Sequence, residues 1–117
     1  MSATQVRRAL EERVGALHRE ATVEAAPGTV DYDAAGPGSH SVAYQITVLV
    51  GLPRYEAVRR ALDRLIEPDG VKAALEQDRT LGGLVTDLSV TKCSGYQLHR
   101  RDETDLLGAT WTVNTLS

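Results

Sequence analysis

The stretch SVAYQITVLVG, residues 41–51, alternates apolar side chains with polar or small ones. Alternation of this kind places successive side chains on opposite faces of a β-strand. One face carries Val42, Tyr44, Ile46, Val48 and Val50, and the other carries Ala43, Gln45, Thr47 and Leu49. The sequence therefore predicts a strand whose first set of side chains faces the core.

Two helices are predicted directly after this strand. Leu52-Pro53 opens the first, because proline is tolerated in the first helical turn, and Pro68 ends it. Its apolar stripe comprises Tyr55, Val58, Leu62, Leu65 and Ile66. A short helix from Val71 to about Gln77 follows, with Asp69 as its expected N-cap. Gly82-Gly83 then stops this segment, since glycine adopts positive φ at little cost.

Two more strands are predicted towards the C-terminus, over Leu84–Ser94 and Leu107–Thr115. Trp111 lies in the centre of the second strand, a position that is more often core than surface. The segment between the two strands, Gly95–Asp105, is polar and charged. We expect it to form a long hairpin tip that leaves the globule and is loose in an isolated subunit.

A first helix is predicted at the N-terminus. Ser2 and Gln5 have capping-box spacing, and the helix is expected to end near His18–Glu20. The apolar residues on one helical face are Val6, Leu10, Val14 and Leu17.

The segment between this helix and the central strand has a weaker pattern. Ala21–Tyr32 contains β-compatible pieces split by Pro27-Gly28, which favours an edge strand or an extended arm. Asp33–Ser41 is a loop rich in Gly and Pro. The whole chain is then one α+β domain, residues 1–117, with a mostly antiparallel sheet, helices on one face of it and a long C-terminal β-hairpin.

Composition excludes several classes of protein. The 117 residues are 42% hydrophobic and 25% charged, as in a folded soluble domain. The net charge of −3 gives no global electrostatic reason to bind nucleic acid or an anionic membrane. The N-terminal residues are too charged for a signal peptide, and no window reaches the length of a membrane span. Cys93, the single cysteine, cannot form an intrachain disulfide.

No constellation of residues predicts catalysis, cofactor binding or a metal site. His18, His40 and His99 show no ligand spacing to one another or to Cys93. Cys93 with His99 is a conceivable nucleophile and base, but no nucleophile elbow or oxyanion-hole signature accompanies them. We therefore expect no enzymatic activity.

One basic pair is a conceivable nucleic-acid contact. Arg100-Arg101, near Tyr96 and His99, could touch phosphates. The adjacent carboxylates of Asp102, Glu103 and Asp105 cancel much of that charge, so a solvated loop is the favoured interpretation.

A family resemblance rests on four runs of residues. They are Leu62-Asp63, GVKAALEQDRTLGG at 70–83, VTDLSV at 85–90 and LGATWTVN at 107–114. With the order of predicted elements, these runs resemble the tail-terminator (head–tail joining) proteins of long-tailed bacteriophages, above all phages of actinobacteria. The likeness covers about Ser41 to the C-terminus and, more loosely, the first helix. The segment from Val23 to Ser41 departs from the family pattern.

The resemblance implies a structural virion protein with no catalytic residues and no cofactor. Six copies would form a ring at the head-proximal end of the tail tube, ending tube polymerisation and joining the tail to a head-completion or stopper connector. Double-stranded DNA would pass through the lumen without specific binding, and no membrane is involved. The protein would reside at the head–tail interface of the virion, and in the host cytoplasm during assembly.

Two segments are the expected arms between ring neighbours, Asp33–Ser41 and the tip Gly95–Asp105. In the ring, Arg100 or Arg101 is expected to pair with carboxylates across the interface. Two alternatives remain open. One is a head-completion or stopper connector, or a tube-like subunit, and the other is a small cytosolic α+β binding domain unrelated to viruses.

Overall fold

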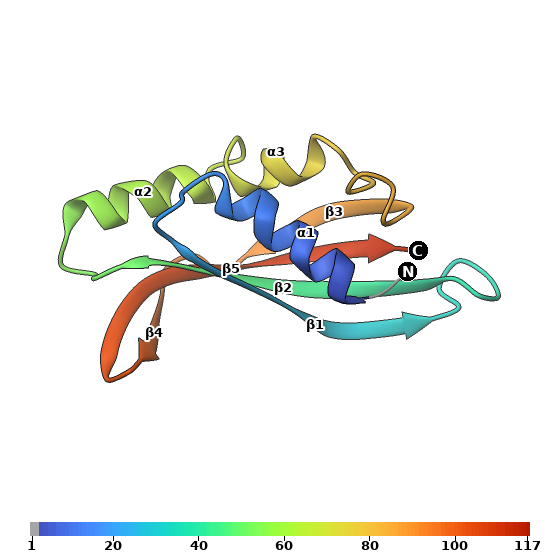
Figure 1. The fold of residues 1–117 in the computed structure, drawn as a ribbon, viewed down its shortest axis with the longest axis horizontal. Coiled ribbons are helices and arrows are strands. Elements are labelled where there is room, and N and C mark those ends of the chain that lie inside the picture. The colour runs from blue at the N-terminus through green and yellow to red at the C-terminus, as the bar shows by residue number, and fades with distance from the viewer. Residues whose placement is uncertain (1–2) are drawn as a thin grey trace.

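A computed structural model describes residues 3–117 of the chain (Figure 1). The expected capping residue Ser2 lies outside the described residues. The helices are α1 (Ala3–Gly15), α2 (Glu56–Ile66) and α3 (Val71–Glu76). The strands are β1 (Thr22–Tyr32), β2 (His40–Gly51), β3 (Asp87–Cys93), β4 (Gln97–Arg101) and β5 (Thr104–Leu116).

All pairings in the five-stranded sheet are antiparallel. The strand order is β1-β2-β5-β3, and β4 pairs with the first part of β5. The three helices lie along one face of this sheet (Figure 1). The predicted fold class, an α+β domain with a mostly antiparallel sheet and a C-terminal hairpin, is thereby confirmed.

The core lies between the helices and the sheet. On β2 the alternation predicted from the sequence is observed, and its inward residues Val42, Tyr44, Ile46 and Val48 are buried. They join Leu62 and Leu65 of α2 and Trp111 of β5 in one apolar cluster. Val6, Leu10 and Val14 add the buried face of α1. Burial of this cluster is the main stabilising contribution to the fold.

β1 is an edge strand, as the proline in it predicts. The outward-pointing backbone N–H of Ala25 donates to Glu11 Oε2 of α1 at 2.9 Å. Pro27, two residues further along the same edge, has no N–H to offer, and the register shifts between Pro27 and Thr29. The first half of this edge is therefore closed to pairing with another strand.

Helix ends differ from the sequence predictions in three places. α1 ends at Gly15 rather than near His18–Glu20, so Leu17 lies beyond the helix and is 43% exposed. α2 begins at Glu56, and Tyr55 precedes it as an exposed side chain in contact with Arg54. Gly70, not Asp69, is the N-cap of α3 and makes no side-chain capping bond.

The tight packing around Gly70 explains why this residue, and not Asp69, is the N-cap of α3. A Cβ at Gly70 would lie 2.4 Å from the carbonyl oxygens of Arg64 and Leu65. The chain therefore turns back tightly against the end of α2, in a position that only glycine fits, and Asp69 is left outside the helix.

The loop between α3 and β3 is organised by one carboxylate. Asp78 accepts hydrogen bonds from the backbone N–H groups of Thr80 and Gly82 and from Arg13 of α1, the last at 3.0 Å. Gly82 and Gly83 have φ of 68° and 93°, as predicted for a stop. Hydrogen bonds from Thr80 and Arg13 hold the pKa of Asp78 well below its usual range.

We expect Asp78→Asn to lower the melting temperature at pH 7. A carboxyl group whose pKa is depressed by folding stabilises the protein above its unfolded pKa, near 4. That stabilisation is lost as pH falls from there towards the folded pKa. The difference between wild type and variant should therefore shrink below about pH 4.

Circular dichroism melts from pH 3 to pH 7 measure this effect. Asp69→Asn is the matched control, since the exposed Asp69 has no bonded partner among the described residues. Equal melting temperatures for Asp78→Asn and wild type at pH 7 would mean that Asp78 does not hold the loop.

Candidate functional site

The sheet face without helices carries neutral polar side chains at its centre, with charged side chains such as Lys92 and Glu24 on the outer strands. Its centre, here called the polar face, comprises Gln45, Thr47, Gln97, Thr110 and Thr112. Thr112 donates to Gln45 Oε1 at 3.3 Å, and Thr110 donates to Gln97 Oε1 at 3.0 Å. Thr47 and Thr110 hydroxyls lie 3.2 Å apart. These five side chains therefore bond to one another across three strands and carry no charge themselves.

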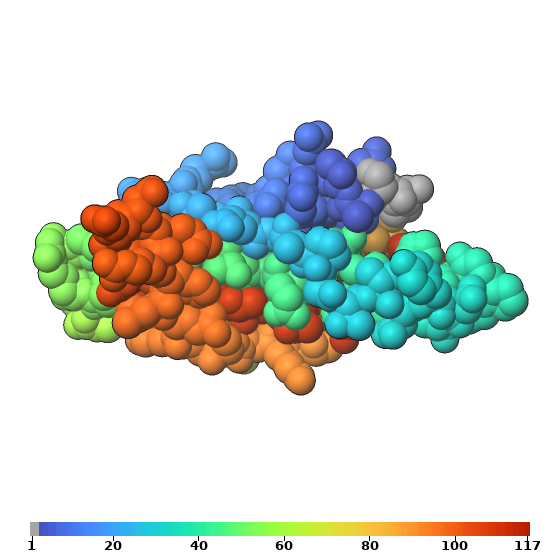
Figure 2. All heavy atoms as spheres, turned by 90° about the horizontal axis from the view of Figure 1, so that it is seen from below, coloured from blue at the N-terminus to red at the C-terminus, as the bar shows by residue number. Residues whose placement is uncertain are grey.

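The β4–β5 hairpin curls towards this face. In Figure 1 it bends away from the helices, and Figure 2 shows it beside the start of β1. Arg101 Nη2 lies 3.2 Å from Glu24 Oε1 of β1. Leu49, which points to the helix-free side, is buried beneath the bend, where Gly108 approaches it closely.

The tip Gly95–Asp105 is therefore not a loose loop, and that prediction is wrong. Leu98 pairs with Leu107 and Arg101 with Thr104, closed by a two-residue turn at Asp102-Glu103. Both turn residues have positive φ, 50° and 64°, as tight hairpin turns require. Arg100 and Arg101, expected to pair across an interface, already have partners within the chain, Asp105 and Glu24.

Tyr96 fixes the connection between β3 and β4. Its hydroxyl bonds to the carboxylate of Asp63 and lies 3.2 Å from the carbonyl oxygen of Arg59, both on α2. The bond to Asp63 raises the pKa of Tyr96. This contact joins the edge of the sheet to the helix layer, and no pattern in the sequence predicts it.

The β1–β2 hairpin forms an arm, defined here as Thr29–Ser41. It projects past the helices at one end of a molecule 49 Å long (Figure 1). The turn is ordered by bonds from Gly38 N to Asp33 Oδ1 at 2.9 Å and from Asp33 N to Ser39 O. Tyr32 is 79% exposed on this arm, and Val30 is also exposed. The arm thus presents apolar side chains that its own domain does not cover.

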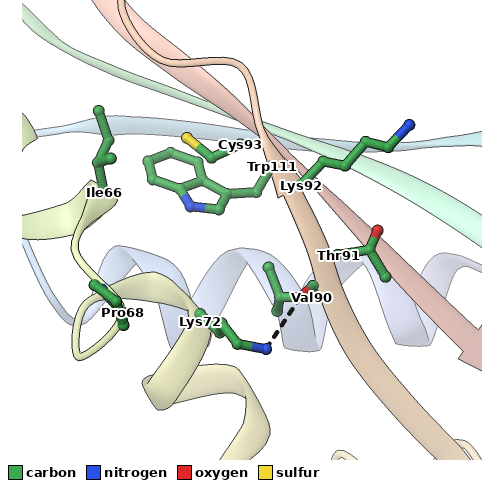
Figure 3. A pocket seen from close by; sticks show the side chains of 8 residues that line it. All are labelled: Ile66, Pro68, Lys72, Val90, Thr91, Lys92, Cys93 and Trp111. Carbon is green, nitrogen blue, oxygen red and sulfur yellow. Dashed lines mark hydrogen bonds between the residues drawn. The ribbon is translucent and has the colours of Figure 1, made fainter.

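The opposite edge of the sheet contains an open pocket of about 300 Å³, here called the edge pocket (Figure 3). Ile66, Pro68, Val90 and Trp111 form its apolar walls, with Cys93 beside the indole. Lys72 and Lys92, the only lysines of the chain, stand at its rim, and Lys92 points outward in Figure 3.

A polar bridge crosses one side of this pocket. Lys72 Nζ lies 2.6 Å from Glu76 Oε2 and donates to Val90 O at 3.2 Å, and Val90 N donates back to Glu76 at 2.8 Å. The hydrogen bond from Lys72 lowers the pKa of Glu76. Side chains of α3 thus satisfy the backbone N–H and C=O groups of Val90 on β3. Of the two lysines at the rim, Lys72 is paired with Glu76, whereas Lys92 has no charged partner among the described residues.

The residues considered for chemistry are not brought together. Cys93 lies opposite Trp111 on the helix side of the sheet, whereas His99 lies opposite Leu106 and bonds to Gln97 on the other side. His18 is in the turn after α1, and His40 opens β2 rather than lying in the loop. Within residues 3–117, no three His, Cys, Asp or Glu side chains converge on a possible metal position. None of the helices described is long and apolar enough to cross a bilayer.

Comparison with known proteins adds no further assignment. No protein-family model matches this sequence, and no curated protein matches it.

Proposed function

We propose that the protein is a tail terminator, a structural subunit of a long-tailed bacteriophage. Six copies form a ring at the head-proximal end of the tail tube, stop its polymerisation and join the tail to the head-completion or stopper connector. The protein acts without catalysis or cofactor. It resides at the head–tail interface of the virion, and in the host cytoplasm during assembly. The proposal rests on the resemblance of residues 41–117 and on the surfaces described above.

The observation that carries the proposal is the polar face. A surface that lets DNA slide past must not hold phosphates, and phosphate binding comes mainly from Lys and Arg. The hydroxyl and amide groups of Gln45, Thr47, Gln97, Thr110 and Thr112 bond to one another and carry no charge. This is the character expected of a lumen through which double-stranded DNA passes without specific binding.

The arginines beside that face support the same interpretation. Arg101 is paired with Glu24, and Arg100 lies 3.4 Å from Asp105. Neutralised guanidinium groups attract phosphates less than free ones do. The hairpin therefore suits contact with protein better than contact with DNA.

The shape of the subunit suits a ring. The arm and the edge pocket lie at opposite edges of one sheet, and the hairpin curls out of its plane. Two different surfaces on one subunit allow head-to-tail contacts, which close into a ring when the rotation per subunit permits. A stopper connector or a tube-like subunit would share this shape, and its axial position in the virion separates it from a terminator.

The edge pocket favours the remaining alternative, a small cytosolic binding domain. It is open, with apolar walls and two lysines at its rim, of which Lys72 is paired with Glu76 and Lys92 is not. A site for a small anionic ligand would have this character. Such a domain would stay monomeric or dimeric at high concentration. Light scattering on concentrated protein, with and without tail tubes, separates it from a ring subunit.

The test removes the hairpin tip. Arg100–Asp105 is replaced by Asn-Gly, so that the directly opposed His99 and Leu106 flank a two-residue turn. We expect the subunit to fold with a cooperative melt, because the apolar core is untouched. We also expect it to fail to cap tails, because the projecting end of the hairpin, residues 100–105, is removed.

Complementation of a phage lacking this gene, with tail lengths measured by electron microscopy, gives the readout. Arg101→Gln is the matched control, which removes only the contact with Glu24. Tails of normal length with the shortened hairpin would show that the hairpin is not an assembly element.

A further inference from the structure

Each free edge of the sheet, β1 and β3, has one segment whose backbone can accept another strand. Asp33 N donates inward to Ser39, so by alternation the backbone groups of Tyr32 and Val30 point outward from β1. Next to β3, Ser94 N donates inward to the carbonyl oxygen of Thr110 on β5. By alternation, the backbone N–H and C=O groups of Cys93 point outward from the sheet. The outer half of β1 and the end of β3 are therefore both open to strand addition.

The side chains at these two edges match face by face. Cross-strand partners share a face of the sheet. Tyr32 lies opposite His40 and Cys93 opposite Trp111, which puts Tyr32 and the edge pocket on the helix side. Asp31 lies opposite Ser41, and Lys92 opposite Thr112, which puts both charges on the helix-free side. A second copy can be added in the same orientation but shifted along the strands, so that Tyr32 of one copy lies beside Cys93 of the other. The aromatic ring of Tyr32 then meets the edge pocket, and the carboxylate of Asp31 meets the ammonium group of Lys92.

Charge supports the same match. From Glu20 to Pro53 the chain has four carboxylates and no Lys or Arg. Asp31 has no bonded partner among the described residues, and Lys92 at the pocket rim has none either. Opposite charges on two edges favour contact between them and disfavour pairing of like edges.

Within the proposed ring, we infer that the arm of one subunit adds to the β3 edge of the next. Tyr32 enters the neighbour's edge pocket against Trp111, and Asp31 pairs with Lys92. The contact is head-to-tail, because the arm and the edge pocket are different surfaces of the same chain. It covers the exposed Tyr32 and Val30, which the subunit alone leaves in water.

A disulfide tests this geometry directly. In Tyr32→Cys, the new thiol and the natural Cys93 cannot join within one chain. They lie on opposite edge strands with β2 and β5 between them, which alone separates them by about 14 Å at the usual strand spacing. Tyr32 also lies several residues along β1 from Ala25, the residue level with Cys93, so the two residues are further apart still. That exceeds the Cα separation of about 7 Å that a disulfide spans. Oxidation with glutathione disulfide should therefore link the introduced thiol of one copy to Cys93 of the next, giving a ladder of oligomers beyond the dimer.

Three controls make the result specific. Tyr32→Cys combined with Cys93→Ser should stop at dimers. Thr22→Cys, exposed at the far end of β1, should give no ladder. Asp31→Lys or Lys92→Asp, added to Tyr32→Cys, should lower ladder yield about two- to fivefold, the size expected of an exposed charge pair, and the double reversal should restore it.

The outcomes separate this inference from the proposed function. A ladder that disappears with Cys93→Ser supports the arm contact. No ladder above the Thr22→Cys control, or a ladder unaffected by Cys93→Ser, overturns it. If the disulfide experiment gives either of these negative results and the protein still caps tails as a ring, only the arm contact is wrong. A ladder from a protein that never caps tails would leave the self-contact standing and overturn the terminator proposal.

Discussion

Leu62→Ala is expected to destabilise the isolated subunit by about 2–5 kcal/mol. Leu62 is 0% exposed and packs in the cluster that holds α2 against β2 and β5. Alanine removes most of the buried side chain and leaves a cavity whose walls relax only in part. Domains of this size have total stabilities of roughly 5–15 kcal/mol, so the loss is severe.

Denaturant unfolding measures this loss, with the buried Trp111, the only tryptophan, as the fluorescence reporter. The protein must be dilute enough to be monomeric, because assembly adds apparent stability. Arg60→Ala on the exposed side of the same helix is the control and should change stability by less than about 0.5 kcal/mol. A loss below about 1 kcal/mol for Leu62→Ala would mean that α2 buries a different face.

Gly108→Ala should cost at least about 3 kcal/mol, the upper end of overpacking effects. A Cβ at Gly108 would lie 2.1 Å from Val48 O and 2.9 Å from Leu49 Cδ2. The first contact is with backbone, which cannot move without breaking the pairing of β2 with β5. The added methyl group therefore forces the two strands apart where the hairpin begins to bend.

The same unfolding experiment, together with tail capping, follows this substitution. Gly15→Ala is the control, because a Cβ there meets no atom within 4 Å. It should be neutral, or stabilising by up to about 1 kcal/mol. If Gly108→Ala unfolds at the same denaturant concentration as wild type, the close approach of β5 to β2 is not as described.

Local patterns predicted much of this fold because they report local physics. The alternation over residues 41–51 defined β2 and its buried face. The glycine pair at 82–83 predicted the turn before β3, and both residues have positive φ. Pro27 predicted an edge strand, since a central strand cannot lose its N–H donor.

Features held by distant contacts were not predicted. β4 has no apolar alternation, and it exists because it pairs with β5 and is joined to α2 through Tyr96. Its turn uses Asp102-Glu103 where Asn-Gly is the usual signal. Leu17 and Tyr55 fit helical periodicities, but the helices end or begin before reaching them.

The candidate surfaces were predicted in part. Asp33–Ser41 is a hairpin turn that projects from the sheet, and Gly95–Asp105 is a paired hairpin rather than a loop; that either segment is an arm between ring neighbours stays a prediction. The edge pocket was not foreseen, because Lys72 and Lys92 are twenty residues apart and meet only when α3 packs beside β3. The polar face likewise depends on strand register, which joins Gln45, Thr47, Thr110 and Thr112 across β2 and β5.

Electron microscopy of tail tubes polymerised with this protein tests the central proposal most directly. Tube subunits are assembled with and without it, and end-on views of the capped end are averaged. We expect tubes of limited length that carry, at one end only, a ring of six copies of the 12.6 kDa chain. Tubes that grow without limit in its presence, or copies bound along the tube wall instead of at one end, would contradict it.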